Sequence, residues 1–372
     1  MADRLGQTIR ELSLTPAPPR APWSIVSLRL ELSRERNSAR AWAGTLAEAS
    51  RPDYAALFAQ AALVAYARVA QPATTLSAPI ITPSGRLPSE IDERACVIGR
   101  AAADLPGLDA LHALTGLYPA LLSDQRRAAL GAFYTPPALD ARLLDQAEDA
   151  GLDLMDARVL DPVAGGGIFL VHVATRMRER LRDSDPTFAL ARIAAGLHGF
   201  EVDPHAAGLA QNALELALAD LTGAAGQVAP AMIQVCDTLE QPASPVFDLV
   251  VGNPPYGRVA LTPDQRRRYA RGLDGHANLY GVFTDIALRW TRAGGLIAYL
   301  TPTNFLAGQH FSALRNLLAT EAPPVGIDFV HARAGVFDEG CRKPCLPSIA
   351  RVRRLAAYGS TISSLPTKAM RR

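Results

Sequence analysis

The spacing of apolar residues changes along the chain, from a helical period in the first third to short apolar runs after residue 150. Residues 39–70 and 91–122 carry apolar side chains at helical spacing, and residues 71–88 between them contain four prolines. A period near 3.6 residues marks one apolar face of a helix, and clustered prolines mark a loop. Residues 1–127 are therefore predicted to form a mainly helical region that packs on the rest of the chain.

Five short apolar runs follow, separated by segments with helical character. They are residues 157–160, 198–202, 232–235, 247–251 and 294–300. Helices are expected up to about residue 182, at 206–221 and at 280–292. Apolar runs that alternate with helices predict an α/β fold with a doubly wound, mostly parallel, Rossmann-like sheet. Ligands of such sheets bind at the carboxyl ends of the strands.

A glycine-rich segment follows the first apolar run. Asp161 ends that run, and Gly165 and Gly167 allow the backbone to approach a ligand closely before the next helix begins. Residues 165–170 read Gly-Gly-Gly-Ile-Phe-Leu, which does not fit the GxGxxG spacing of dinucleotide-binding loops. By itself this segment is as consistent with an ordinary turn as with a cofactor site.

Acidic residues stand at the ends of the next two apolar runs. Glu201 is placed to accept two hydrogen bonds from a ribose diol, and Asp237 to accept one from an adenine amino group. Each also has a plainer interpretation, a solvated acid at a strand end for Glu201 and a helix cap or turn for Asp237. A glycine loop and two acids at three successive strand ends form a set that chance rarely produces, which favours a cofactor site.

Asn253-Pro254-Pro255-Tyr256 directly follows the fourth apolar run. The amino nitrogen of adenine is a poor nucleophile because its lone pair is delocalised into the ring. The Asn253 side-chain oxygen and the Pro254 carbonyl can each accept one N–H, which frees that lone pair to attack a methyl-sulfonium. Two prolines stiffen the loop, and Tyr256 offers a ring face for a flipped base. The segment predicts methyl transfer to an amino nitrogen without a strong general base.

Charge is divided unevenly along the chain. Residues 341–372 contain eight Lys or Arg and no acid, and the remaining 30 basic and 36 acidic residues give a net charge of −6. Residues 341–372 are therefore predicted to be a basic, disordered tail. Residues 1–340 lack the broad excess of positive charge that DNA binding normally uses.

Cysteine usage and hydropathy exclude several classes of protein. Four cysteines have neither CxxC spacing nor a histidine at metal-ligand spacing, so we expect no disulfide framework and no metal site. No run of 18 uncharged apolar residues occurs, and the first ten residues are polar. We therefore expect a cytoplasmic protein without a membrane span.

Together these segments resemble the catalytic domain of amino-methyltransferases that act on DNA adenine, particularly the type IIG restriction-modification group. Residues 131–137 resemble the motif of that group that contacts the cofactor, and 161–170 resemble its glycine loop. Residues 200–204 resemble its ribose-binding strand end. Residues 253–256 match its catalytic tetrapeptide without a change, and Phe337 stands where the group places an aromatic that packs on the flipped base.

The resemblance implies a class I methyltransferase domain at residues 128–340. This domain would transfer a methyl group from S-adenosylmethionine to the N6 amino group of adenine in double-stranded DNA, within a restriction-modification or phage-defence system. The cofactor residues that it implies are Tyr134, Thr135, Pro136, Asp161, Ala164, Gly165, Gly167, Glu201 and Asp237. The residues that it implies for catalysis and base stacking are Asn253, Pro254, Pro255, Tyr256 and Phe337. A separate specificity or restriction subunit is a further expected partner.

The chain departs from this group after Gly340. The group continues with a pair of apolar strands and a target-recognition domain, whereas this chain continues with a basic segment that contains Ser and Pro. We therefore expect a truncated or frame-shifted ending, no target-recognition domain and an unpaired sheet edge. DNA binding by this chain alone is expected to be weak, dependent on salt and indifferent to sequence.

Other interpretations remain open from the sequence. A glutamine methyltransferase that acts on peptide-release factors also uses Asn-Pro-Pro-Tyr after a helical region, and methyltransferases of ribosomal guanine are a second alternative. Residues 134–137 and the Asp-Pro opening of the glycine loop argue against both. A fused metal-dependent nuclease would need a lysine beside paired acids, and residues 1–342 contain no lysine. A non-catalytic remnant that binds cofactor is a further alternative.

Overall fold

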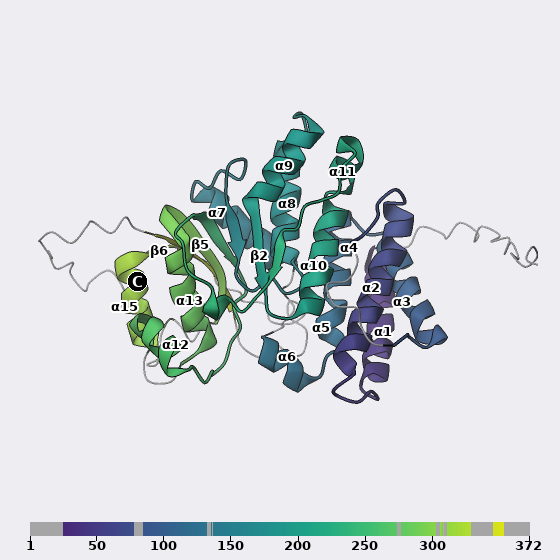
Figure 1. Cartoon of the computed structure of the whole chain (residues 1–372), viewed down its shortest axis with the longest axis horizontal. Coiled ribbons are helices and arrows are strands. Elements are labelled where there is room, and N and C mark those ends of the chain that lie inside the picture. Colours follow the sequence, from purple (N-terminus) through teal and green to yellow (C-terminus); the bar gives the residue numbers. More distant parts are fainter. Residues whose placement is uncertain are drawn as a thin grey trace, which may run out of the picture.

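A mixed β-sheet forms the centre of the structure (Figure 1). The computed structural model describes residues 25–77, 85–131, 135, 137–273, 277–302, 306, 308, 311–328 and 345–352. Within these residues the sheet has seven strands in the order β3-β2-β1-β4-β5-β7-β6. The strands are β1 Val159–Asp161, β2 Leu197–Glu201, β3 Ile233–Val235, β4 Phe247–Gly252, β5 Thr291–Pro302, β6 Pro324–Ile327 and β7 Cys345–Arg351.

The five strands from β3 to β5 in this order are parallel, which confirms the predicted doubly wound sheet. Alternate residues of a strand enter separate hydrophobic cores: Val159 and Leu249 belong to one, and Leu160 and Val250 to the other. Because a hydrophobic core covers each face of the sheet, these strands are apolar at nearly every position. Their apolar runs could therefore be recognised in the sequence. The strand order reverses between β1 and β4, which places the switch point there.

Helices cover both faces of the sheet (Figure 1). One face carries α7 Pro137–Asp149, α8 Ile168–Arg180, α9 Pro186–Gly196 and α10 Pro204–Ala217. The other carries α13 Leu279–Trp290 and α15 Ser312–Glu321. Shorter elements are α11 Ala219–Ala225, η1 Thr238–Glu240, α12 Pro263–Arg268 and η2 Ala270–Gly272. Among the described helices, none has the length and apolar character that a membrane crossing requires.

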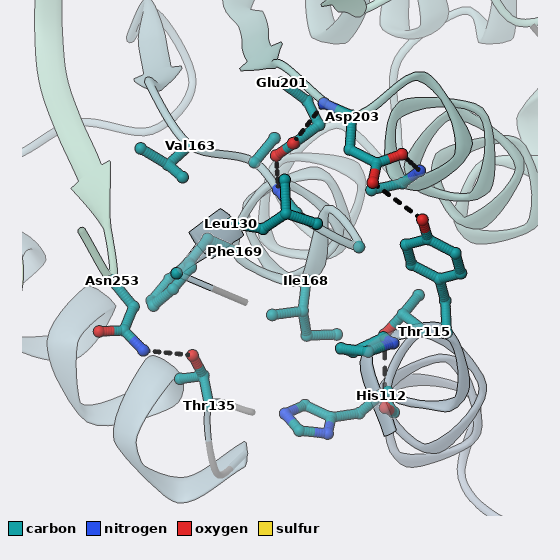
Figure 2. Close-up of a pocket in the computed structure, with 18 residues that line it drawn as sticks. His112, Thr115, Leu130, Thr135, Val163, Ile168, Phe169, Glu201, Asp203 and Asn253 are labelled. Atoms are coloured by element: carbon teal, nitrogen blue, oxygen red, sulfur yellow. Dashed lines mark hydrogen bonds between the residues drawn. The ribbon is translucent and has the colours of Figure 1, made fainter. Parts of the chain in front are cut away.

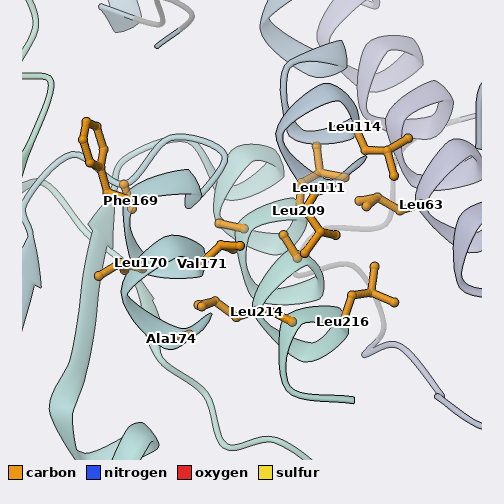
Figure 3. Close-up of a cluster of buried hydrophobic side chains, with 14 of the residues drawn as sticks. Leu63, Leu111, Leu114, Phe169, Leu170, Val171, Ala174, Leu209, Leu214 and Leu216 are labelled. Carbon is orange, nitrogen blue, oxygen red and sulfur yellow. The ribbon is translucent and has the colours of Figure 1, made fainter. Parts of the chain in front are cut away.

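The N-terminal third contains α1 Ile25–Ala43, α2 Arg51–Ala70, α3 Ser89–Ala102, α4 Gly107–Thr115, α5 Leu117–Leu121 and α6 Asp124–Leu130. The helix expected at 39–70 is divided in two, because the chain turns at residues 44–50. Leu63 of α2, Leu114 of α4 and Leu209 of α10 lie in one buried cluster (Figure 3). The N-terminal helices and the sheet region therefore share one hydrophobic core.

The prediction of a disordered tail from residue 341 is wrong for residues 345–351. They form β7, which pairs antiparallel with β5 from Leu296↔Arg351 to Pro302↔Cys345 and with β6 on its other side. Ile349 is 1% exposed and belongs to the core. The basic composition of residues 341–372 led to the prediction of disorder, although this segment contains a strand with the buried apolar residues Ile349 and Ala350. The expectation of an unpaired edge at β5 is wrong for the same reason.

Candidate active site

A cavity of about 780 Å³, including its open mouth, lies at the carboxyl ends of β1, β2 and β4 (Figure 2). The loop after β1 contributes Val163 to Gly166, the end of β2 contributes Glu201, and the residue after β4 contributes Asn253. These segments are far apart in the sequence, and the parallel sheet brings them to one edge. A cavity at a switch point is the usual ligand site of an α/β protein.

The glycine loop is held closely on its inner sides and is open towards the cavity. A side chain at Gly166 would come within 2.9 Å of Thr115, and one at Gly167 would come within 2.8 Å of Ala210. At Gly165 a Cβ would meet nothing within 4 Å. The loop therefore leaves open space at Gly165, where a ligand can approach the backbone.

Glu201 lies at the end of β2 with its carboxylate buried beside the glycine loop. One carboxylate oxygen accepts the Gly165 N–H at 2.7 Å, and the other accepts the Asp203 N–H at 2.8 Å. Burial raises the pKa of Glu201, and these two hydrogen bonds oppose that rise. Each oxygen keeps a second lone pair, so the carboxylate can accept two further hydrogen bonds. Glu201 thus both fixes the loop and offers acceptors to a ligand.

Asp161 supports the site from below the loop. One of its oxygens accepts the Val163 N–H at 3.0 Å, and burial raises the pKa of its carboxyl to about 7. It is 1% exposed and is not among the residues that line the cavity. A side chain at Gly252 would come within 2.9 Å of the Asp161 carboxylate. Asp161 therefore packs directly against the backbone that leads into Asn253.

Asn253 is held by hydrogen bonds at both ends of its amide. Its Nδ2 donates to the Thr135 hydroxyl at 3.3 Å (Figure 2), and its Oδ1 accepts from the Tyr256 hydroxyl at 2.5 Å. The Tyr256 hydroxyl also lies 3.0 Å from the Leu300 carbonyl oxygen. Thr135 and Asn253 both line the cavity, and these contacts fix which atom of the amide points in which direction. The side chain is therefore oriented before any substrate arrives.

The N-terminal helices supply one wall of the cavity, which the sequence did not predict. Thr115 ends α4 and Tyr118 lies in α5, and both line the cavity. The Tyr118 hydroxyl donates to Asp203 at 2.8 Å (Figure 2), directly beyond the strand end that holds Glu201. Burial and the nearby Asp203 carboxylate raise the pKa of Tyr118. His112 lies on the same wall, where burial lowers its pKa.

Asp237 lies within the described residues, whereas three other predicted site residues do not. Asp237 accepts the Leu239 N–H at 2.9 Å as the cap of η1 and is not among the residues that line the cavity. Its proposed contact with adenine stays a prediction. Tyr134, Pro136 and Phe337 lie outside the described residues.

Residues 197–337 match the model of the Eco57I restriction-modification methylase family. This segment is therefore similar to a restriction-modification methylase domain, and we refer to it as the methylase segment. Two curated relatives agree with this match. The Type II methyltransferase M.TthHB8I of Thermus thermophilus is 30% identical over 214 residues, which cover 55% of this chain and 42% of that protein. The Type II methyltransferase M.PaeR7I of Pseudomonas aeruginosa is 30% identical over 225 residues, 54% of this chain and 36% of that protein. The chain spans less than half the length of these relatives.

Solved structures share the fold of the methylase segment and the N-terminal helices. The DrdV–DNA complex superposes with a TM-score of 0.59 at 16% identity and covers 88% of this chain and 42% of that one. A Listeria monocytogenes protein described as a class I S-adenosylmethionine-dependent methyltransferase has a TM-score of 0.53 at 13% identity, with 90% and 91% coverage. At these identities the likeness concerns the fold, and it agrees with the predicted class I methyltransferase architecture.

The matched methylase segment contains Glu201 and Asn253, but the glycine loop and the N-terminal wall precede it. The cavity joins all of them in one site. Gly131 shows how closely they fit: a Cβ at this position would lie 2.1 Å from the Pro255 Cβ. The segment before the sheet therefore lies directly against residues 253–256, the predicted catalytic loop.

Gly131→Ala is expected to reduce the methyl transfer that we propose below much more than Gly226→Ala. Both glycines are left-handed, with φ of +63° and +61°, so alanine costs about 1–2 kcal/mol of backbone strain at either. Only at Gly131 would the new methyl displace Pro255, because Gly226 faces open space. Transfer rates and thermal melts of the two variants separate the causes. Equal losses of transfer in both variants would show that the Pro255 contact has no catalytic role.

Proposed function

We propose that this chain binds S-adenosylmethionine in the cavity and transfers a methyl group to the N6 amino group of adenine in double-stranded DNA, as the modification component of a restriction-modification system. The observation that carries the proposal is that Asn253 shares one cavity with the glycine loop and Glu201. The names of the two curated relatives support this function over a glutamine methyltransferase or a non-catalytic remnant.

The residues of the cavity fit S-adenosylmethionine. Glu201 offers two free acceptor positions for a ribose diol, and Gly165 leaves room for the ligand at the loop backbone. Val163, Ile168 and Phe169 provide apolar surface for a purine ring. When bound, the cofactor supplies the methyl group as a sulfonium. The contribution of this chain is to hold the two reactants in line and to exclude water.

Asn253 acts on the incoming base through its side-chain oxygen. This oxygen has two acceptor positions, of which the Tyr256 hydroxyl uses one, and the second can accept an N–H of adenine. The Pro254 carbonyl is proposed to accept the other N–H. Because both protons are then held, the nitrogen lone pair leaves conjugation with the ring and can attack. The methylated nitrogen is cationic, so its proton is lost without a strong base.

The function is tested with purified chain, tritium-labelled S-adenosylmethionine and unmethylated duplex DNA. Transfer of label to DNA, with N6-methyladenine as the product in the hydrolysate, would support the proposal. Label recovered as methylglutamine would favour the protein methyltransferase instead. Cofactor binding without transfer to DNA or protein would favour the non-catalytic remnant.

Glu201→Ala is expected to weaken S-adenosylmethionine binding at least about tenfold, a loss of roughly 1.4 kcal/mol. The variant loses the two acceptors for ribose and also releases the Gly165 and Asp203 N–H groups, which are left without that acceptor. Calorimetric titration measures the affinity, and a thermal melt shows whether the variant is folded. Asp237→Ala is measured alongside, as a separate test of the second acid. Unchanged affinity in a folded Glu201→Ala variant would remove Glu201 from the site.

A further inference from the structure

A concentration of positive charge follows the catalytic loop directly. Residues 257–273 contain five arginines and one acid, in a chain whose first 340 residues carry a net charge of −6. Helix α12 in this segment lies at the lower edge of the molecule in Figure 1, on the side of the carboxyl ends of the parallel strands. This excess is local, and it begins four residues after Asn253, which lines the cavity.

Two of the five arginines stabilise the fold. Arg268 donates to the Leu239 carbonyl at 2.7 Å and lies 3.8 Å from Glu240. Arg271 donates to the buried Asp285 at 2.7 Å and to Glu321 at 2.8 Å. Their charges are balanced by these partners, so they add little to the positive potential outside.

The other three arginines, Arg258, Arg266 and Arg267, are exposed, and we refer to them as the α12 surface. Arg267 pairs with Asp264, but both side chains are more than 70% exposed, and such pairs are worth about 0–1 kcal/mol and are screened by salt. Arg258 stands two residues after Tyr256, where its backbone forms a bridge with Asn278. A polyanion can therefore compete for the Arg267 guanidinium group at low cost.

A second short helix, α6, shares four consecutive residues with α12 and ends near Pro255. α6 is capped by Ser123 and reads Asp-Gln-Arg-Arg from residue 124, and α12 is capped by Thr262 and reads Asp-Gln-Arg-Arg from residue 264. α6 ends just before Gly131, whose Cα lies against Pro255 of the catalytic loop. Both helices lie at the lower edge of the molecule in Figure 1. Exposed arginine is thus present in both short helices, as Arg126 in α6 and as Arg266 and Arg267 in α12.

We propose that the α12 surface binds the phosphates of the DNA strand that flanks the flipped base. This inference rests on the proposed function, because it assumes that a duplex approaches the mouth of the cavity. Guanidinium groups hold phosphate oxygens by paired, charge-assisted hydrogen bonds. A chain with a net negative body needs such a local source of attraction to bring a polyanion to its catalytic loop.

The test compares the full chain with Arg258→Ala/Arg267→Ala in equilibrium binding to a fluorescent duplex over a series of salt concentrations. The plot of log affinity against log salt is expected to become shallower by about two units, since each phosphate contact contributes about 0.9. Arg182→Ala is the matched control, because Arg182 is also exposed and pairs with an acid three residues earlier, Glu179. It follows α8, which begins at the glycine loop and lies in the upper half of the molecule in Figure 1, and it should leave the slope unchanged.

The outcomes distinguish this inference from the function on which it rests. S-adenosylmethionine affinity should be the same in all three proteins. If the double variant keeps the salt slope of the wild type while the wild type methylates DNA, the α12 surface is not a phosphate site. If the wild type and the double variant differ in slope as expected but the wild type transfers no methyl group to DNA, the proposed function fails and the DNA-binding surface stands. A loss of about one unit of slope in Arg182→Ala, the same loss per arginine removed as in the double variant, would reduce the effect to net charge and overturn the inference.

Discussion

Asn253→Ala is expected to reduce methyl transfer to DNA by about 10²–10³-fold while S-adenosylmethionine affinity stays close to that of the wild type. The range is that found when one preorganised polar group is removed from a catalytic site. The expected split arises because Asn253 is proposed to act on the amino group of the base, with an interaction that strengthens as the lone pair is freed in the transition state. The Asn253 amide is already oriented by Thr135 and Tyr256, so little reorganisation accompanies the reaction.

Single-turnover transfer with labelled cofactor measures this effect, and calorimetric titration measures cofactor affinity. Asn316→Ala is the control, because Asn316 is exposed on α15, away from the residues that line the cavity. A folded Asn253→Ala variant that keeps most of its transfer rate would rule out the proposed role of Asn253. A loss of cofactor affinity equal to the loss of rate would instead place Asn253 in the cofactor site.

The parallel strands and the catalytic loop could be predicted from the sequence for physical reasons. A strand that is buried on both faces has to be apolar at nearly every position, as residues 247–251 are, and such runs are visible without an alignment. Asn253 follows one of these runs at once, so its position at a strand end follows from the strand. Glu201 could be placed in the same way. Their positions could be predicted because each follows from the strand that precedes it, whereas their hydrogen-bond partners Thr135 and Gly165 lie in other segments.

The N-terminal wall could not be predicted because it depends on contacts between distant segments. Nothing in the sequence around Tyr118 indicates that its hydroxyl meets Asp203, 85 residues later. Thr115 borders the glycine loop only because Gly166 lets α4 approach to within 2.9 Å of where a Cβ would stand. Helical periodicity predicted that this region packs on the sheet, but it did not predict which of its residues line a cavity. The prediction of a helical scaffold therefore missed part of the site.

This wall changes how the two regions relate to each other. A scaffold that merely covers the sheet could be replaced without effect on the site. Here Thr115 of α4 meets the glycine loop, Tyr118 of α5 bonds Asp203, and Gly131 lies against Pro255. The cavity is therefore formed jointly by α4, α5 and the strand ends of the sheet.

Ile349→Ala is expected to lower the free energy of unfolding by about 2–5 kcal/mol, the usual cost of removing a large aliphatic side chain from a core. Ile349 is the 1% exposed residue at the centre of β7, opposite Ala298 of β5 and Gly326 of β6. Its side chain belongs to the same hydrophobic cluster as Leu249 and the N-terminal helices. Loss of this contact would weaken the strand that joins β6 to the rest of the sheet.

Urea unfolding followed by circular dichroism measures the effect, with Val325→Ala as the matched control. Val325 lies on the neighbouring β6 but is 53% exposed, so its truncation should change stability by no more than about 0.5 kcal/mol. If Ile349→Ala is as stable as the wild type, residues 345–351 do not contribute a strand to the core, and the disordered tail expected from composition would be correct. If the variant is destabilised as expected, the basic charge of residues 341–372 flanks a strand that the sheet requires. The β5 edge is then covered by the chain itself, because β7 supplies the backbone partners that an exposed edge would otherwise offer to another molecule.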